Sequence, residues 1–210
     1  MQPAFIAIIR SLSCYIDISA NKNNPHPVSH RQRLAIIAIT SISYYLLYRL
    51  NMTLFGSLHF SHRVDWIFLP SGLRLAFVLL FLTDGAIGIA LASTFITYLL
   101  YFDSSYVSML LNGSIAGLAP YLARQMAIQY WQLDPNLRNL KTIGILKISV
   151  LFAFISALIH QLWYFWNGKT DDFIASASVM MVGDLLGTLI VLFALKIMVP
   201  KFNFLKKAPD

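Results

Sequence analysis

The chain alternates between long apolar stretches and short polar segments from residue 34 almost to its C-terminus. The apolar stretches predict six membrane-spanning helices, at residues 34–58, 66–82, 86–101, 106–128, 142–166 and 173–199. Their lengths are close to the roughly 17–25 residues that a helix needs to cross the hydrocarbon core of a bilayer. Only Thr-Asp-Gly separates the second helix from the third, so we expect these two to form a tight helical hairpin.

The residues before the first of these helices follow a different pattern. Apolar side chains at Phe5, Ile8, Ile9, Leu12 and Ile16 recur at helical spacing, which is typical of an amphipathic helix lying in the membrane interface. We therefore expect an all-α membrane protein, a polytopic bundle of about six transmembrane helices preceded by an amphipathic interfacial helix. Its parts are the interfacial helix and a polar linker at 1–33, the six-span domain at 34–200 and a short basic tail at 201–210.

Composition points to the same class of protein. Hydrophobic residues make up 58% of the chain and charged residues only 12%, with a mean hydropathy of +0.66. A soluble domain carries about twice that charged fraction. The net charge of +7 does not indicate nucleic-acid binding, because no basic run is interleaved with aromatic residues.

The basic residues concentrate on alternate loops. They precede the first predicted helix, lie between the fourth and the fifth, and follow the sixth, whereas the opposite loops carry only Arg63 and Lys169. Lysine and arginine are enriched in cytoplasmic loops. We therefore expect a multi-pass protein of a bacterial inner membrane with both termini in the cytoplasm.

Polar side chains inside the predicted helices are the candidate functional residues. Five of them fall in the outer half of the membrane at about 1.5 Å of rise per residue: Arg74, Asn112, His160, Gln161 and Asp184. Ionisable groups within spans generally face the protein interior or a water-filled cavity. Two interpretations stay open: the five residues line an outward-facing ligand pocket, or Arg74 and Asp184 form a purely structural ion pair.

Catalytic and metal-binding motifs are not evident. All nine acidic residues are Asp, and Cys14 is the only cysteine, which excludes multi-cysteine metal sites. His59 and His62 lie near Asp65, but two imidazoles and one carboxylate make an incomplete metal site. We expect no enzymatic activity, no catalytic residue, no metal and no cofactor.

Two stretches resemble the motifs of a bacterial family of sensory domains. The first is LPSGLRLAFVLLF, which follows Trp66 and leads into GAIGIALAS, and the second is MMVGDLLGTLIVLFALKI at 180–197. They resemble the Trp-x-Pro-x-Gly start and the Gly-Asp-x-x-Gly helix of the membrane-associated sensor domains of the first type. The matching residues are Trp66, Pro70, Gly72, Gly183, Asp184 and Gly187.

The resemblance implies a sensor-like or ligand-binding integral membrane protein that acts through protein partners. Members of that family usually have more spans and a fused output domain, and their proline comes sooner after the tryptophan. Two alternatives stay open: the substrate-binding subunit of a vitamin-type uptake transporter, and a structural or assembly scaffold of a membrane complex. The expected partners are the lipid bilayer, a protein in or at the membrane and a small molecule from the outer side.

Overall fold

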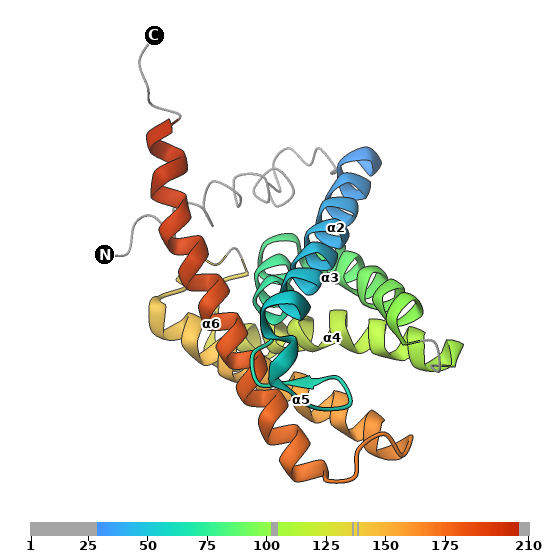
Figure 1. Cartoon of the computed structure of the whole chain (residues 1–210). Coiled ribbons are helices and arrows are strands. Elements are labelled where there is room, and N and C mark those ends of the chain that lie inside the picture. Colours follow the sequence, from blue (N-terminus) through green and yellow to red (C-terminus); the bar gives the residue numbers. More distant parts are fainter. Residues whose placement is uncertain (1–28, 102–104, 136, 138, 206–210) are drawn as a thin grey trace.

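The computed structural model describes residues 29–101, 105–135, 137 and 139–205 (Figure 1). This part of the chain contains five long helices: α2 (His30–Phe55), α3 (Pro70–Leu100), α4 (Tyr106–Trp131), α5 (Thr142–Trp166) and α6 (Phe173–Leu205). Between α2 and α3 lie a 3-10 turn, η1 (Gly56–Leu58), and an antiparallel hairpin of β1 (His59–Ser61) and β2 (Val64–Asp65). The predicted all-α class is confirmed apart from this small hairpin, and the predicted interfacial helix falls outside the described residues.

Helix α3 reverses direction at Leu82, whose φ of 53° and ψ of −125° are not helical. Asp84, just after the break, pairs with Arg33 near the start of α2, with 2.8 Å between Oδ1 and Nη2. Farther along both helices, the hydroxyl of Ser41 donates to the carbonyl of Gly88 at 2.8 Å. The second part of α3 therefore runs beside α2 in the same direction. This is the tight hairpin that the sequence predicts, with its reversal one residue before Thr-Asp-Gly.

Small residues bring α4 close to the second part of α3. Gly113 lies against Ala90 and Thr94, and Gly117, one turn later, lies against Ala86. The later glycine of α4 contacts an earlier residue of α3, so the two helices are antiparallel. A side chain at either glycine would meet a backbone carbonyl of α3, which is the reason that small residues are favoured where membrane helices approach closely.

Helices α5 and α6 complete the bundle. Helix α5 packs on α4 and α6, and α6 also packs on α3. The start of α2 and the end of α6 lie at one end of the molecule, and the β-hairpin lies toward the other, which we call the hairpin end (Figure 1). All five helices contribute side chains to the cavity described below.

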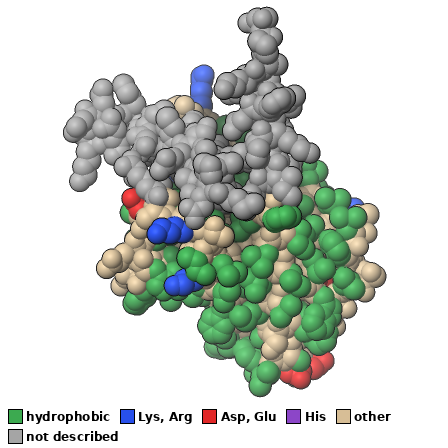
Figure 2. Space-filling model, turned by 90° about the vertical axis from the view of Figure 1, so that its left-hand side faces the viewer, with side chains coloured by type: hydrophobic (Ala, Val, Ile, Leu, Met, Phe, Trp, Pro, Cys, Tyr) green, Lys and Arg blue, Asp and Glu red, His purple; other side chains and the backbone are tan. Residues whose placement is uncertain are grey.

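Four described helical stretches are long and apolar enough to cross a membrane: His30–Leu58, Pro70–Leu100, Thr142–Trp166 and Phe173–Leu195. The second includes the reversal at Leu82, and α4 is not among the four. Hydrophobic side chains cover most of the described surface in Figure 2, and the charged ones lie toward its upper part and its lower tip. Helices of this length and composition are those of an integral membrane protein.

Two glycines of α6 let the chain before α3 lie directly on that helix. A methyl group at Gly183 would collide with the carbonyl of Asp65, and one at Gly187 with the carbonyl of Phe68. The amide of Phe68 also donates to the carbonyl of Gly183 at 3.2 Å. These contacts hold β2 and the start of α3 on the stretch of α6 that carries Asp184.

Candidate functional site

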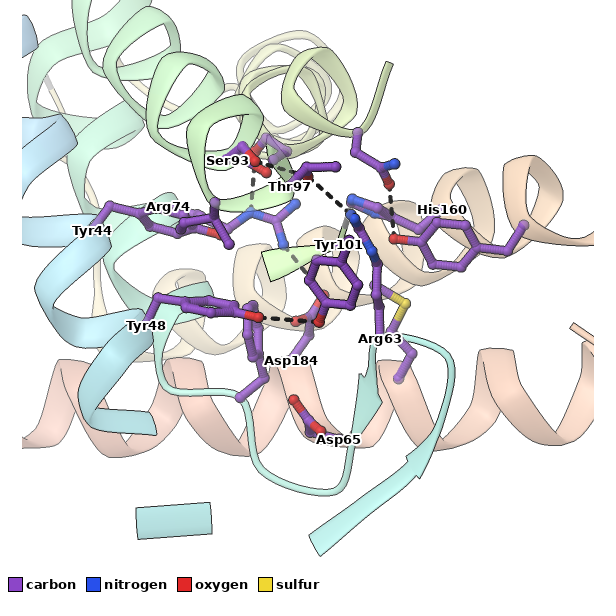
Figure 3. A pocket seen from close by; sticks show the side chains of 16 residues that line it. Tyr44, Tyr48, Arg63, Asp65, Arg74, Ser93, Thr97, Tyr101, His160 and Asp184 are labelled. Atoms are coloured by element: carbon purple, nitrogen blue, oxygen red, sulfur yellow. Dashed lines mark hydrogen bonds and ion pairs between the residues drawn. The ribbon is translucent and has the colours of Figure 1, made fainter. Parts of the chain in front are cut away.

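A cavity of about 60 Å³ lies inside the hairpin end of the bundle (Figure 3). All five helices and the β-hairpin contribute side chains to its wall. Four of the five polar residues singled out from the sequence line it, namely Arg74, Asn112, His160 and Asp184. Gln161 is fully buried outside this wall, where the hydroxyl of Thr170 donates to its Oε1 at 3.0 Å.

Arg74 and Asp184 face each other across part of the cavity without a hydrogen bond. Each is only 1% exposed, and Nη1 of Arg74 is 3.9 Å from Oδ2 of Asp184, which is beyond hydrogen-bond distance. Nε of Arg74 donates to the carbonyl of Ala116 at 3.1 Å. Within the described part of the chain, Nη2 of Arg74 and Oδ2 of Asp184 have no hydrogen-bond partner. Charged atoms that are buried and unpaired are rare in folded proteins and call for an explanation.

Ser71 fixes the position of Asp184 relative to α3. Its Oγ lies 2.7 Å from the carbonyl oxygen of Asp184 and 2.7 Å from that of Phe68. The hydroxyl of Thr188, one turn after Asp184, donates to the same Oγ at 3.2 Å. Ser71 therefore links the start of α3 to α6 immediately beside the cavity.

Arg63, which the sequence places in an outer loop, is part of the cavity wall. It lies in the turn between β1 and β2 with a left-handed φ of 58°. Its Nη1 donates to Oγ1 of Thr97 at 3.1 Å, and its Cζ lies 3.8 Å from the centre of the Tyr101 ring, a cation–π contact. Its Nε and Nη2 are buried and have no partner among the described residues.

The hairpin brings Arg63 inward because Val64 is anchored in the core. Val64 is fully buried and packs with Ala157, Val179 and Met180 of α5 and α6. These partners are more than 90 residues away in the chain, so no local pattern in the sequence indicates the insertion. A polar loop containing one arginine has the same appearance whether it lies in solvent or folds into the bundle.

Tyrosines supply much of the remaining wall. The hydroxyls of Tyr48 and Tyr101 are 3.2 Å apart, and the hydroxyl of Tyr164 donates to Oδ1 of Asn112 at 2.9 Å. Tyr44 also lines the cavity. No pattern in the sequence distinguishes these tyrosines, because aromatic residues in an apolar helix can face either lipid or a cavity.

His160 is held in one tautomer by the backbone. Its Nδ1 is 2.8 Å from the carbonyl oxygen of Ser156. A carbonyl oxygen can only accept, so Nδ1 carries the proton and the neutral ring leaves Nε2 as an acceptor. His160 is thus the one imidazole of the predicted set that can accept a hydrogen bond from an occupant of the cavity.

His62 lies in the hairpin turn and packs edge-on against two tyrosine rings of the wall. Burial lowers its pKa to about 4, with smaller contributions from the positive charges of Arg63 and Lys169. The ring is therefore neutral near pH 7. His59, in contrast, contacts Asp65 at 2.8 Å between Nδ1 and Oδ1, and no group of three potential metal ligands occurs among the described residues.

The residues of the first motif lie beside the cavity and shape its surroundings. Trp66 packs edge-on against Phe60 at 5.9 Å between ring centroids and is 45% exposed. Pro70 is the first residue of α3, where a missing amide hydrogen is tolerated. Gly72 lies against Val191 of α6, where a larger residue would collide. All three residues affect how the start of α3 packs on its neighbours, and none of them lines the cavity.

No protein-family model, curated protein or solved structure matches this chain.

Proposed function

We propose that this chain is a sensor-like integral membrane protein that binds a small polar molecule in the cavity and acts through a protein partner. The observation that carries this proposal is the set of buried, unpaired charged atoms of Arg63, Arg74 and Asp184 around one cavity. A purely structural ion pair is stabilising only when the two groups are close and their other atoms are satisfied. The separation of 3.9 Å and the unpaired atoms favour the ligand-pocket interpretation.

The proposed topology has six membrane-embedded segments, with the reversal at Leu82 dividing α3 into two of them. The positive-inside rule places the start of α2 and the end of α6 in the cytoplasm of a bacterial cell. The hairpin end and the cavity then face the outside.

The first part of α3 supports an outward-facing cavity. Residues 70–81 cover only about 18 Å of a hydrocarbon core that is about 30 Å thick. The remaining depth on the outer side contains the irregular chain before α3 and the cavity. Non-helical backbone at membrane depth is tolerated where it is buried in protein or lines a water-filled cavity. This segment packs on α6 and contributes Phe68 to the cavity wall.

Transmission to a partner would run through α3 and α6. Arg74 belongs to the first and Asp184 to the second, so an occupant that binds between them changes the spacing of the two helices. A ligand shifts such an equilibrium by its difference in affinity for the two arrangements. Helix α6 continues from Asp184 to Leu205 at the other end of the bundle, where a cytoplasmic partner would detect the movement.

Thiol labelling of whole cells tests the proposal. The natural Cys14 is replaced by Ser, and single cysteines are introduced as Asn112→Cys and, in a separate protein, His160→Cys. We expect a small membrane-impermeant methanethiosulfonate to label both positions from outside. Lys169→Cys in the loop before α6 is the positive control, and Thr142→Cys at the start of α5 is the control that reacts only after permeabilisation. Protection of both cavity positions, with Lys169→Cys labelled, would contradict the outward-facing cavity.

A further inference from the structure

The unpaired atoms around the cavity are of two opposite kinds. Nε and Nη2 of Arg63 and Nη2 of Arg74 are hydrogen-bond donors, while Oδ2 of Asp184 is an acceptor, and none of the four makes a hydrogen bond among the described residues. An arginine nitrogen can only donate, and an ionised carboxylate can only accept. An occupant that satisfies all of them needs both an acceptor group and a donor group.

The charges of the wall also limit the net charge of the occupant. Arg63 and Arg74 contribute two positive charges, and Asp65 and Asp184 contribute two negative charges. The formal charges of these four side chains are thus balanced without an occupant. A simple anion or cation would leave one uncompensated charge in a buried site, which is costly, whereas an occupant with no net charge preserves the balance.

The donors of Arg63 and the acceptor of Asp184 belong to different elements of the wall. The guanidinium of Arg63 lies at the hairpin, over the ring of Tyr101 and beside Thr97. The carboxylate of Asp184 lies on α6 next to Arg74, and both are almost fully buried. Figure 3 shows Arg63 of the hairpin and Asp184 of α6 among the side chains that line the cavity. A molecule that contacts both must carry an acceptor group and a donor group.

The size of the cavity restricts the occupant to a compact molecule. Its volume of about 60 Å³ is several times the space that a single water molecule requires. It is small for the drug-sized ligands that fill pockets of roughly 300–1,000 Å³. The wall also presents the faces and hydroxyls of tyrosines, which suit the short aliphatic body of such a molecule.

From these observations we infer that the occupant is a compact zwitterion, with its carboxylate held by Arg63 and Arg74 and its ammonium group held by Asp184. Charge-assisted hydrogen bonds at both ends are the strong kind. This inference depends on the proposed function, since it names the class of molecule that the outward-facing cavity accepts. The class comprises short amino acids and related ammonium carboxylates.

A thermal-unfolding panel on the full chain in lipid nanodiscs tests the inference. The probes are glycine, β-alanine and 4-aminobutyrate as zwitterions, acetate as an anion, methylammonium as a cation and acetamide as a neutral polar molecule. We expect at least one zwitterion to raise the melting temperature by about 5–10 °C at a hundredfold excess over its Kd. At the same concentrations the three other probes should produce no comparable shift.

A matched pair of variants assigns any shift to this cavity. Arg63→Gln removes one charge from the wall, and Lys169→Gln removes one exposed charge at the same end of the bundle. We expect Arg63→Gln to weaken zwitterion binding at least tenfold and Lys169→Gln to leave it unchanged. Because zwitterions can also stabilise proteins by exclusion from their surface, an equal shift in both variants would overturn the inference.

The remaining outcomes separate the inference from the proposed function. A shift of equal size with acetate, methylammonium or acetamide would overturn the zwitterion class but leave a ligand-binding cavity. No shift with any zwitterion, together with labelling of Asn112→Cys from outside, would overturn the inference while the cavity remained accessible. Protection of the cavity positions from labelling would instead remove the proposed function itself.

Discussion

Arg74 and Asp184 form a buried ion pair whose charged groups make no hydrogen bond to each other. Both are almost excluded from solvent, yet they make contact at 3.9 Å and each retains an unpaired charged atom. Their depths can be estimated from helix rise alone, so the sequence predicts their proximity. The distance between them also depends on Ser71 and on two glycines of α6, which position the helices. The separation of Arg74 and Asp184 therefore cannot be predicted from the residues that neighbour each of them in the chain.

Removing one member of this pair should be more harmful than removing both. Arg74→Ala or Asp184→Ala leaves an uncompensated buried charge, a change that typically costs about 3–5 kcal/mol. The double variant removes both charges and should recover part of that loss. Melting temperatures of the three purified variants provide the measurement. A double variant that is less stable than either single variant would show that the two residues are not coupled in this way.

His62 should make stability depend on pH below neutrality. Its folded pKa of about 4 lies below the value of about 6.5 in the unfolded chain. Between those values the unfolded state binds a proton that the folded state does not bind. Stability is therefore unaffected above about pH 6.5 and decreases as the pH falls toward 4. Because the ring is only half-buried, the loss at pH 5 should be on the order of 1 kcal/mol.

Comparison with His62→Gln isolates this effect. The variant lacks the titrating ring, so its melting temperature should fall less between pH 7 and pH 5 than that of the natural protein. Only the difference between the two slopes is informative, because loss of the aromatic contacts can lower stability equally at every pH. Identical slopes would mean that His62 is protonated as easily in the folded protein as in the unfolded chain.

The small residues of α6 allow neighbouring backbone to pack directly against the helix. The chain between β2 and α3 lies directly on its glycines Gly183 and Gly187. Asn51 of α2 also contacts this part of the chain, because its Oδ1 accepts a hydrogen bond from the amide of Leu69 at 2.8 Å. Glycines at this spacing in the sequence indicate a close approach of helices. The partner is instead an irregular segment, because the carbonyls of Asp65 and Phe68 occupy the space that the two glycines leave.

A substitution of one α6 glycine should therefore be strongly destabilising. In Gly187→Ala the new methyl group would collide with the backbone of Phe68, which cannot move without displacing the start of α3. Overpacking of this kind typically costs about 1–3 kcal/mol or more. Gly56→Ala is the matched control, because nothing lies within 4 Å of its added Cβ and its φ of −59° is helical.

The control should be neutral or slightly stabilising, since alanine restricts the unfolded chain more than glycine does. Thermal unfolding of the two variants in the same nanodiscs makes the comparison. Equal stability of Gly187→Ala and Gly56→Ala would refute the close contact between α6 and the chain before α3.

Charge is distributed over the whole molecule in a way that matches the proposed topology. The unpaired buried charges of the cavity wall lie at the hairpin end. Arg33 and Asp84 pair at the other end, where Arg33 is 46% exposed along its side chain. An exposed pair of this kind contributes little to stability, about 0–1 kcal/mol. The proposed orientation in the membrane depends on the positive charges near that end.

The sequence alone determined the helical class, the membrane character and the reversal after the second apolar stretch. Each of these depends on local physics: the length of apolar runs, the low charged fraction, and the turn residues between helices. It also selected four residues of the cavity wall, because a polar group deep in an apolar helix needs a protein or water partner.

Only the tertiary structure decided how the cavity is closed and what charges face it. The inward path of the hairpin depends on the burial of Val64 between α5 and α6, and Arg63 enters the wall with it. Gln161 is excluded from the same wall because it bonds instead to Thr170. Such contacts join residues that are distant in the chain, so their geometry follows from the packing of whole helices and not from any local pattern of residues.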